Sequence, residues 1–355
     1  MSAVEPGEQW KREIDSIGRT INTLHPKVRL TDLRDAVEDL QTNIANLPNK
    51  VKDLRSRGYP FGKDWEGRAV DLAQQWASLQ PRVSAQIEQQ AMALELALRP
   101  IEEQFRRLVA LQTTSQEAQL QIGQIKAALS SLESKISAAQ GQIRGMYDAL
   151  ERQVGEFHRH LQRVDWTLKQ LAEASFPLLA AEAGIMAVKA TWVRGEKEDK
   201  SDPQGVLYLT DQRLLFEQKQ EIAIKKVLFI TKEKERVQKL LFEVPLAWIE
   251  SVQASKRGLL GHEDHLDFTF TSDASAQAAH FHIDGQDCHM WQGLVGRAKA
   301  GEFAQDRAVP LDQAVVEKVR SAPTACPYCG AAINTPVLRG MDSIRCEYCG
   351  KVIRW

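Results

Sequence analysis

The chain has 355 residues, of which 46 are Lys or Arg and 47 are Asp or Glu, and 43% of its residues are hydrophobic. At about 100–200 residues per domain, this length predicts two or three domains with more than one core. The balanced charge excludes a basic coat for nucleic acid and a long acidic disordered tail.

The charge stays balanced when it is counted by region. Residues 1–175 carry 23 basic and 23 acidic side chains, 176–300 carry 16 and 18, and 301–355 carry 7 and 6. No stretch approaches the roughly 18 uncharged apolar residues of a membrane span, and the first residues lack a basic segment followed by an apolar one. We therefore expect a cytoplasmic protein, with peripheral contact to a membrane as an open alternative.

The first region, residues 1–175, has the apolar spacing of α-helices. Its apolar residues recur at alternating steps of three and four, which is typical of the seam of a coiled coil or a narrow helical bundle. This first seam consists of two series: Ile14, Ile17, Ile21, Leu24 and Val28, and then Leu30, Leu33, Val37, Leu40, Ile44, Leu47, Val51 and Leu54. Kinks or breaks are expected at Pro26 and Pro48, and helix starts at Pro81 and Pro100.

A longer seam follows Pro100 and predicts one helix over about 101–172. Its members are Ala118, Ile122, Ile125, Leu129, Leu132, Ile136, Ala139, Ile143, Met146, Leu150, Val154, Phe157, Leu161, Val164, Leu168 and Leu171. We interpret both seams as packing surfaces of a coiled coil that self-associates or pairs with a helical partner. A surface lying on a membrane is the alternative, but it should have a wide apolar face flanked by Lys and Arg, and these seams are narrow.

Between residues 180 and 300 the apolar period changes to two, which predicts strands. The expected strands are 185–193, 205–210, 213–218, 227–230, 239–244, 249–255, 265–271 and 280–283. One helix should follow near 286–300, with Met290, Leu294 and Val295 toward the core. Strands followed by a single helix predict a curved sheet or barrel closed by a C-terminal helix. The fold class expected for the whole chain is therefore α+β and multidomain.

Two segments of this region carry a family resemblance. The stretch Gly205-Val-Leu-Tyr-Leu-Thr-Asp-Gln-Arg-Leu-Leu-Phe216 is similar to the signature hairpin of GRAM and bacterial PH-like domains. The stretch Val244-Pro-Leu-Ala-Trp-Ile-Glu-Ser-Val252 is similar to a later strand of the same family. The resemblance implies a domain that binds lipid or protein and does not catalyse a reaction.

The charges near the expected loops help to decide whether this domain binds lipid or protein. Phosphoinositide-binding PH domains hold phosphates with basic residues near the first strand-connecting loop. The matching loop here, residues 195–204, contains four acids against two lysines, which would repel an anionic head group. The candidate residues for contact with an anionic surface are Lys225, Lys226, Lys232, Lys234, Arg236 and Lys239. The alternative interpretation of this basic stretch is a solvated sheet edge that discourages pairing between molecules.

Histidines gather in the same region. They are His262, His265, His280, His282 and His289, and Cys288 lies beside the last of them. The two-residue period of a strand places His280 and His282 on one face. Cys288 and His289 are adjacent and would diverge on a helix, which disfavours a shared metal ion. Whether this histidine group binds anything stays open at the level of sequence.

The strongest motif lies at the C-terminus, in residues 326–355. Two Cys-x-x-Cys-Gly knuckles, Cys326 with Cys329 and Cys346 with Cys349, are separated by sixteen residues. Four thiolates at this spacing form the closed tetrahedral shell of one structural Zn²⁺ ion, with no position left for a catalytic water. Paired disulfides are disfavoured because nothing indicates an oxidising compartment, and a redox role because no thioredoxin-like pattern surrounds the pairs.

The zinc ribbon should be nearly neutral, because its small excess of basic side chains is offset by the two negative charges of a zinc tetrathiolate. This disfavours phosphate binding, so a nucleic-acid partner is not expected. Trp355, at the apolar C-terminal end, is a candidate anchor for a protein partner. Residues 301–325 should form a linker with one short amphipathic helix that carries Leu311, Val315, Val316 and Val319.

No catalytic constellation is present in the sequence, which lacks a Gly-rich phosphate loop, a Gly-x-Ser-x-Gly elbow and a His-Glu-x-x-His pair. We therefore expect no enzyme but a scaffold or adaptor. Its coiled coil would pair, and its PH-like domain and ribbon would bind protein partners. A peripheral membrane protein that reads anionic lipid through the PH-like domain is the alternative, and a nucleic-acid-associated factor is a weaker one.

Overall fold

The computed structural model describes residues 6–111, 115–227, 230–258, 261–274 and 276–355, and the side chains of 8–111, 115–221, 236–258, 261–274 and 276–355. Four helices come first: α1 (Pro6–Val28), α2 (Thr31–Ser56), α3 (Trp65–Leu111) and α4 (Gln116–Ala172). The chain divides into two compact units. The helical unit comprises residues 1–49 and 66–158, and the sheet unit comprises 50–65 and 159–355.

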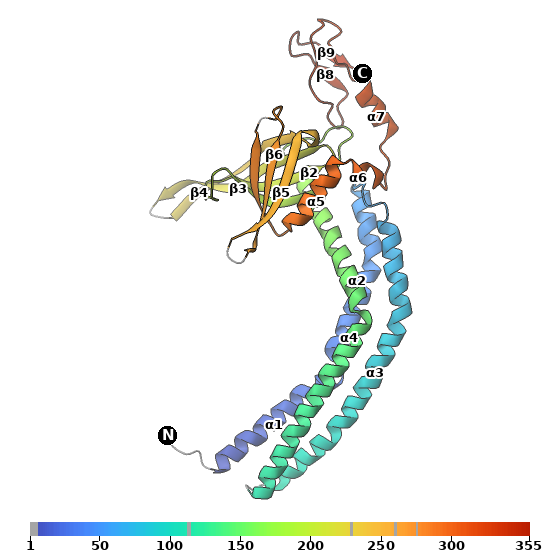
Figure 1. The fold of residues 1–355 in the computed structure, drawn as a ribbon, viewed down its shortest axis with the longest axis vertical. Coiled ribbons are helices and arrows are strands. Elements are labelled where there is room, and N and C mark those ends of the chain that lie inside the picture. Colours follow the sequence, from blue (N-terminus) through green and yellow to red (C-terminus); the bar gives the residue numbers. More distant parts are fainter. Residues whose placement is uncertain (1–5, 112–114, 228–229, 259–260, 275) are drawn as a thin grey trace. The chain divides into compact units, whose positions relative to one another are not determined.

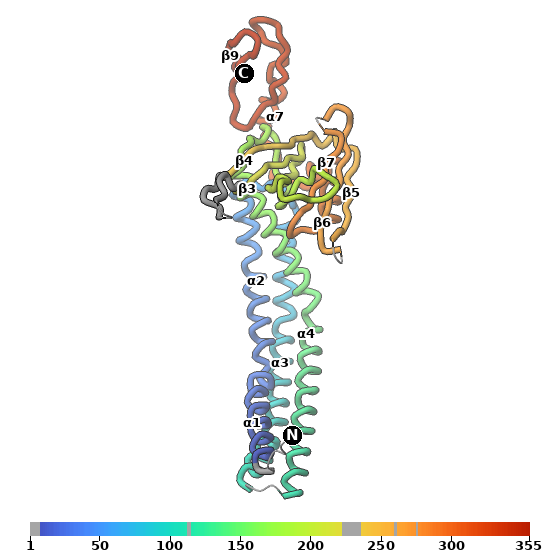
Figure 2. Tube along the Cα trace, turned by 90° about the vertical axis from the view of Figure 1, so that its left-hand side faces the viewer, coloured from blue at the N-terminus to red at the C-terminus, as the bar shows by residue number. Residues whose placement is uncertain are grey.

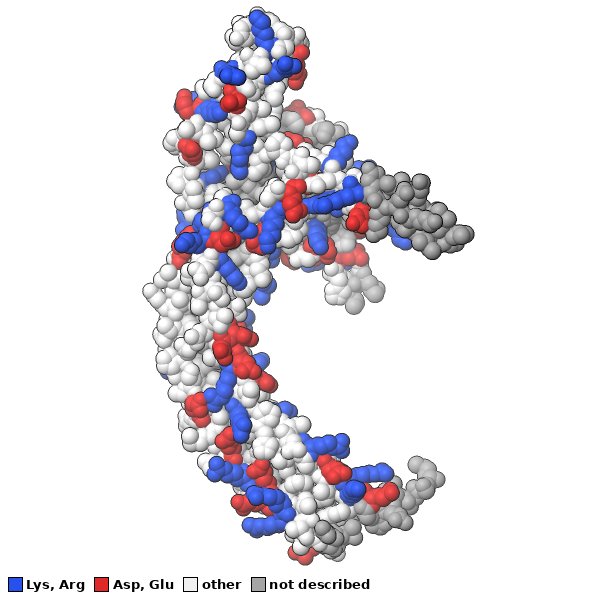
Figure 3. Space-filling model, turned by 180° about the vertical axis from the view of Figure 1, so that it is seen from behind, with Lys and Arg blue, Asp and Glu red and all other residues white. Residues whose placement is uncertain are grey.

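The helical unit is a bundle in which α1 and α2 follow one another along α3 and α4 (Figure 2). Both apolar seams are buried inside it, from Ile17 to Leu47 in the first and from Ala118 to Phe157 in the second. Ion pairs along the outside join the turn after α1 to α3, α1 to α4, and α2 to α3. On the face drawn in Figure 3, basic and acidic side chains alternate along the helices and neither sign gathers. The mixed charges are therefore the solvated outside of a core formed within one chain.

The helix boundaries differ from those expected at the prolines. Pro48 lies inside α2, Pro81 and Pro100 lie inside α3, and none of them begins a helix. The break in the first pair of helices comes after Pro26, where Leu30 has a positive φ of 53° yet is fully buried. Each proline removes one backbone hydrogen bond from its helix, but the free energy gained by burying a continuous apolar seam outweighs this loss.

The single helix expected over about 101–172 is instead two helices. Residues 101–111 complete α3, and α4 begins at Gln116. The Ser115 hydroxyl accepts a hydrogen bond from the amide of Ala118 at 3.3 Å, which caps the start of α4. The long seam starts at Ala118, directly after this cap. In the shifted part of the seam, Tyr147 is buried where Met146 was expected and Met146 is half-buried.

The sheet unit contains a curved antiparallel sheet of seven strands in the order β4-β3-β2-β1-β7-β6-β5 (Figure 1). The strands are β1 (Gly184–Val193), β2 (Gln204–Thr210), β3 (Arg213–Val227), β4 (Ile230–Pro245), β5 (Ile249–Arg257), β6 (Glu263–Phe270) and β7 (Ala278–Asp284). A short 3₁₀ turn, η1 (Leu246–Trp248), joins β4 to β5, and α5 (Cys288–Lys299) packs on β5 and β6. Strand β1 pairs with both β2 and β7, so it joins two antiparallel meanders.

Two expectations about this sheet are corrected. The strand expected at 227–230 is absent as a separate element, because Val227 ends β3 and Ile230 begins β4, and the two residues pair at the end of one long hairpin. In α5, Trp291 is fully buried, whereas Met290 is half-buried. Asp287 caps α5 by accepting a hydrogen bond from the amide of Met290, so Met290 lies in the first turn, away from the buried side.

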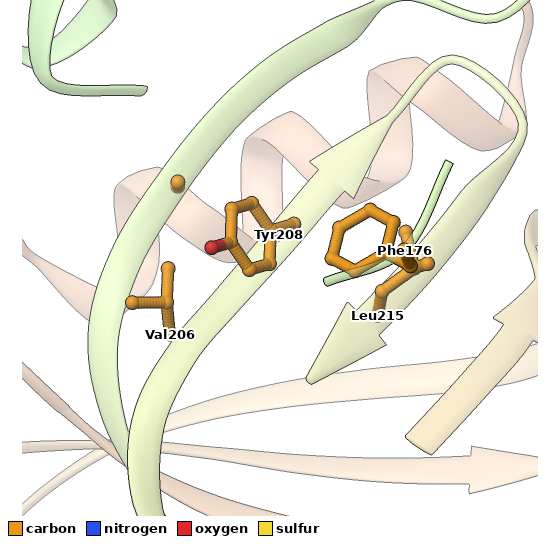
Figure 4. Close-up of a cluster of buried hydrophobic side chains, with 5 residues drawn as sticks. Phe176, Val206, Tyr208 and Leu215 are labelled. Atoms are coloured by element: carbon orange, nitrogen blue, oxygen red, sulfur yellow. The ribbon is translucent and has the colours of Figure 1, made fainter. Parts of the chain in front are cut away.

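Both faces of the β1–β3 meander are covered. One face contacts an aromatic core formed by rings such as Trp192, Phe216 and Phe281. The opposite face carries a second cluster, Phe176, Ala187, Val206, Tyr208 and Leu215, against which Trp166 of α4 packs (Figure 4). Burial on both faces explains why residues 185–188 are all buried instead of alternating.

The β2–β3 hairpin is fixed by buried polar groups. Arg213 and Glu182 are 6% and 1% exposed and form an ion pair of 2.5 Å, and the hydroxyl of Thr210 donates to Glu182 at 2.6 Å. Gly205 faces the carbonyl of Glu217 so closely that an added Cβ would lie 1.9 Å from its oxygen. The hairpin segment that carries the family resemblance therefore needs these residues for packing and hydrogen bonding.

Residues 57–65 pack against the chain after α5. The ring of Phe61 contacts Phe303 of α6 (Glu302–Gln305), and Tyr59 stacks on Trp65. The amide of Ala308 donates to the carbonyl of Pro60 at 2.7 Å. The predicted linker thus begins with residues that are part of the core of the sheet unit.

The rest of the sheet unit is α7 (Gln313–Arg320) and a two-stranded ribbon, β8 (Ser343–Arg345) and β9 (Val352–Arg354). The predicted α+β, multidomain fold class is confirmed: a helical N-terminal region precedes an antiparallel sheet with a C-terminal helix, and a small ribbon follows. Among the described helices, none combines the length and the apolar character that crossing a membrane requires.

Candidate metal centre

The four C-terminal cysteines lie on two tight turns with the same backbone hydrogen bonds. In each turn the first cysteine accepts a hydrogen bond from the glycine that follows the second cysteine, at 2.8 and 2.9 Å. These glycines, Gly330 and Gly350, have φ of 75° and 71°, a region that favours glycine. The repeated Cys-x-x-Cys-Gly spacing therefore produces two equivalent loops that aim their thiols at one point.

The four thiols form one compact cluster. All four Sγ atoms lie within 4.8 Å of one another. The Sγ atoms of Cys326 and Cys349 are 3.7 Å apart, as are those of Cys329 and Cys346. Four sulfurs at about 2.3 Å from a central zinc would be roughly 3.8 Å apart at the corners of a tetrahedron. The spacing therefore fits a tetrathiolate metal ion, and the residues present supply all four ligands.

The pKa values of the thiols are also consistent with binding of a cation. Burial raises the pKa of Cys326, but hydrogen bonds from the amides of Tyr328 and Cys329 lower it to about 7. The amide of Ala331 lowers the pKa of Cys329, whereas burial and hydrogen bonds with the other thiols raise it to about 12. Without a cation the cluster thus retains protons, because four thiolates so close together would repel one another.

The ribbon has little other material for a core. Its buried cluster is Cys326, Cys346 and Ile353, with Ala331 and Ile333 packed against it. The second cysteine of each knuckle, Cys329 and Cys349, is exposed. So few buried apolar residues are typical of small modules that are stabilised by a bound metal ion.

The ribbon is attached to the rest of the sheet unit by hydrogen bonds that the sequence did not reveal. The amide of Ala180 donates to Val337 O and the amide of Arg339 donates to Leu178 O, both at 2.9 Å. The Arg339 guanidinium also donates to the carbonyl of Glu182, next to the buried ion pair. The segment before β1 therefore connects the ribbon to the β2–β3 hairpin.

Trp355, the candidate anchor for a protein partner, is half-buried within the chain. Its indole Nε1 donates to the carbonyl of Lys318 in α7 at 2.8 Å. Its role in contacting a partner stays a prediction. Two side chains that the sequence did not single out are far more exposed: Tyr328 at 58% and Tyr348 at 78%. Each tyrosine directly precedes the second cysteine of a knuckle, and this repeated position was the signal available in the sequence.

The candidate basic stretch lies on the β3–β4 hairpin. The side chains of Lys225, Lys226, Lys232 and Lys234 lie outside the described residues, whereas Arg236 and Lys239 are exposed. Arg236 pairs in register with Glu221, and Lys239 with Gln218. The arrangement brings these residues onto one hairpin, and contact with an anionic surface stays a prediction.

Three of the four acidic residues of the β1–β2 loop have partners within the chain. Asp202 is 6% exposed and accepts hydrogen bonds from the amides of Arg194 and Asp199. Glu198 pairs with His282 at 2.6 Å. These carboxylates fix the loop, in addition to disfavouring an anionic head group there.

Three of the predicted histidines come together on β6 and β7. Nδ1 of His265 lies 2.9 Å from Nε2 of His280, and the ring of His265 stacks on that of His282 at 4.6 Å. Burial lowers the pKa of His265 and His280. Among the described residues, the four-cysteine group is the one metal-ligating cluster, so the histidines do not present a second one. Cys288 is buried at the start of α5 and lies apart from the thiol cluster.

No family model matches the chain, and no curated protein matches it. Among solved structures, it is similar to the crystal structure of human RhoA in complex with the DH/PH fragment of PDZRHOGEF, with 12% identity and a TM-score of 0.23, over 84% of this chain and 96% of that one. It is also similar to the N-terminally truncated linker-DH/PH domains of p115-RhoGEF, with 13% identity and a TM-score of 0.22, over 82% and 98% of the respective chains. At these TM-scores the likenesses support no conclusion about fold or function.

Proposed function

We propose that this protein is a non-enzymatic adaptor, in which a zinc-stabilised ribbon on a PH-like sheet binds protein partners. The observation that carries the proposal is the closed cluster of four thiols beside two exposed tyrosines. A metal ion with four protein ligands has no position for water or substrate, so its contribution is to hold the ribbon in shape. The ribbon is then a rigid support for the side chains around it.

The proposed ligands of one Zn²⁺ ion are Cys326, Cys329, Cys346 and Cys349. Thiolates favour zinc over the hard cations Mg²⁺ and Ca²⁺, and a tetrahedral sulfur shell is typical of structural zinc or iron–sulfur sites. The separation of 3.7 Å between sulfurs supports a single ion at the centre. Five free thiols also favour a reducing compartment, so we keep the cytoplasm as the expected location.

The partner surface that we propose includes Tyr328 and Tyr348. Exposed tyrosines combine a large apolar ring with a hydroxyl, and such residues often dominate the energy of protein interfaces. The Nζ atom of Lys351 lies 4.5 Å from the ring centre of Tyr328, which orients that ring. Neither tyrosine belongs to the buried cluster of the ribbon, so the folding of the ribbon does not depend on their side chains.

The helical unit serves this adaptor as a spacer. Its seams are buried by helices of the same chain, so little apolar surface of the seams is left for a second copy. Self-association through a coiled coil and pairing with a helical partner stay predictions, as does membership of the sheet in the GRAM family. The acidic β1–β2 loop and the near-neutral ribbon continue to favour protein over anionic lipid or nucleic acid.

The proposal is tested by quantitative affinity capture from the native host with wild-type protein and a Tyr328→Ala/Tyr348→Ala variant. We expect a specific set of partners to be lost with the tyrosine variant, while bound zinc stays at one ion per chain. The matched control is Met92→Ala/Leu96→Ala, since these side chains on α3 are 65% and 56% exposed. Equal capture by all three proteins, or a zinc content far from one ion per chain, would contradict the proposal.

A further inference from the structure

A pocket of about 400 Å³ lies between the C-terminal part of α4 and the middle of the sheet, where β1 pairs with β7. From α4 it is lined by Arg159, Arg163 and Trp166, and from the sheet by Lys189 and Asp284. All of these residues belong to the sheet unit. The pocket is separate from the thiol cluster and from the β3–β4 hairpin, and the proposed adaptor function does not use it.

The two arginines place adjacent positive charges on α4 without a carboxylate partner among the described residues. Arg159 and Arg163 are one helical turn apart, and like charges at that spacing destabilise a helix. Neither forms an ion pair with a described residue, although exposed arginines elsewhere on α4, such as Arg152, do. The two guanidinium groups thus lie close together, and no described carboxylate neutralises their positive charges.

The Nε atom of Arg163 is buried and has no hydrogen-bond partner. Burial, and then the neighbouring positive charge of Arg159, lower the pKa of Arg163. A buried donor without an acceptor costs free energy unless something outside the chain accepts from it. Because Nε itself is buried, the pocket is lined by other atoms of Arg163, and it is the charge of the guanidinium that the pocket leaves uncompensated.

The opposite wall of the pocket has a fixed shape and a third cation. Lys189 has no ion-pair partner among the described residues, and Asp284 lies opposite it in the β1–β7 register. The side-chain amide of Gln286 is held at both ends, donating to Ala187 O and accepting from Trp291 Nε1, each at 2.8 Å. The lining of the pocket therefore contains three cationic side chains and one carboxylate. Hydrogen bonds of Gln286 fix the wall of the pocket on the side of the sheet.

We propose that this pocket binds a small molecule that carries a phosphate monoester, with the phosphate on Arg159, Arg163 and Lys189. Guanidinium forks donate paired hydrogen bonds to phosphate oxygens, and a phosphate dianion matches the excess of two positive charges. The volume exceeds that of phosphate alone and lies in the range of pockets for small organic ligands. The ring of Trp166 forms an apolar wall for the rest of the molecule.

A phosphate monoester can come from a soluble metabolite or from the head group of a lipid, and the experiment separates these sources. Titration calorimetry of the full-length chain uses inorganic phosphate and glycerol 3-phosphate as soluble probes. Sedimentation uses phosphatidylcholine vesicles with and without phosphatidylinositol 4-phosphate. Binding to the soluble ester identifies a metabolite site, and binding only to the phosphorylated vesicles identifies a lipid head group.

The decisive variant is Arg159→Gln/Arg163→Gln, with Arg106→Gln/Arg107→Gln on α3 as a control that removes the same charge from exposed positions. We expect at least about tenfold weaker binding for the first variant and unchanged binding for the control. The thermal stability of the first variant should not fall, because the substitution removes a like-charge pair. No binding of either class of probe, equal binding by both variants, or a marked loss of stability in the first variant would overturn the proposal.

Discussion

The helical unit and the C-terminal ribbon achieve a defined structure by different means. The helical unit buries two long apolar seams and leaves mixed charges outside, as a bundle with many core residues can. The ribbon buries two cysteines and a few small or branched side chains. The first is stabilised by apolar burial within the chain, whereas we propose that the second is stabilised by a zinc ion held by its four cysteines.

The largest effect should come from removing the metal ligands. We expect Cys346→Ser to abolish zinc binding and to unfold the ribbon, because structural zinc contributes about 10–16 kcal/mol of apparent binding free energy in small modules. Hydrogen exchange should show loss of protection in residues 324–355 and none in α3 and α4. Treatment of wild-type protein with a chelator should reproduce this pattern.

Cys288→Ala is the matched control, because Cys288 is a buried cysteine outside the cluster. It should retain one zinc ion per chain. Equal loss of zinc from both variants would show that the four-thiol cluster is not the metal site.

A smaller but still large effect is expected at the buried ion pair of the sheet unit. Glu182→Ala leaves the guanidinium of Arg213 buried with only Glu243 beside it, and breaking such a pair destabilises by about 3–5 kcal/mol. Urea unfolding followed by a probe in the sheet should register this loss. Asp148→Ala, which breaks the exposed pair with Arg152 on α4, should cost less than about 1 kcal/mol.

The seams of the helical unit give a comparable test of apolar burial. Leu47 is fully buried, and Leu47→Ala should destabilise the bundle by about 2–5 kcal/mol through lost burial and a residual cavity. Leu120 is 64% exposed, so Leu120→Ala should change stability by less than about 0.5 kcal/mol. Thermal unfolding followed by circular dichroism measures both. Similar values for the two variants would contradict a core formed within one chain.

The smallest effect concerns pH. Burial, followed by the charges of His282 and Arg257, lowers the pKa of His265 below its usual 6.5, despite the opposing effect of Glu263. The unfolded chain therefore binds more protons below about pH 6.5, and stability falls as the pH decreases from there through the lowered pKa. His265→Phe should unfold with a flatter pH dependence between about pH 7 and 5 than the wild type.

The control for this measurement is His262→Gln, since His262 is exposed and lies just before β6. Its pH dependence should follow that of the wild type. The same slope for wild type and His265→Phe would rule out a contribution from His265.

Several features of the fold followed from local pattern. The apolar steps of three and four identified the seam residues from Ile17 to Leu54, and the period of two placed most strands within a few residues of their ends. The four cysteines were identified from spacing alone, because short turns fix the direction of their side chains. The sequence pattern was sufficient to predict the structure where the interacting residues lie close in sequence, or where an apolar periodicity continues over many residues.

Other features needed contacts between distant segments. Pro48, Pro81 and Pro100 remain inside helices because the seams on either side are buried, which a local rule for proline cannot anticipate. Continuous burial of residues 185–188 depends on Trp166 and Phe176 covering the second face of the sheet. The long hairpin of β3 and β4 was missed because its strands are charged and lack apolar alternation.

The sequence by itself determined that this protein has a helical region, a region of strands followed by one helix, and a ribbon with four clustered cysteines, because period and spacing encode each of these locally. Tertiary structure alone decided that the seams cover one another within the chain and that Trp355 binds α7. It also decided that Arg159 and Arg163 of α4 meet Lys189 of β1 in one pocket. The physical reason is that burial and charge compensation depend on which distant side chains come together, and neither is visible in the order of residues.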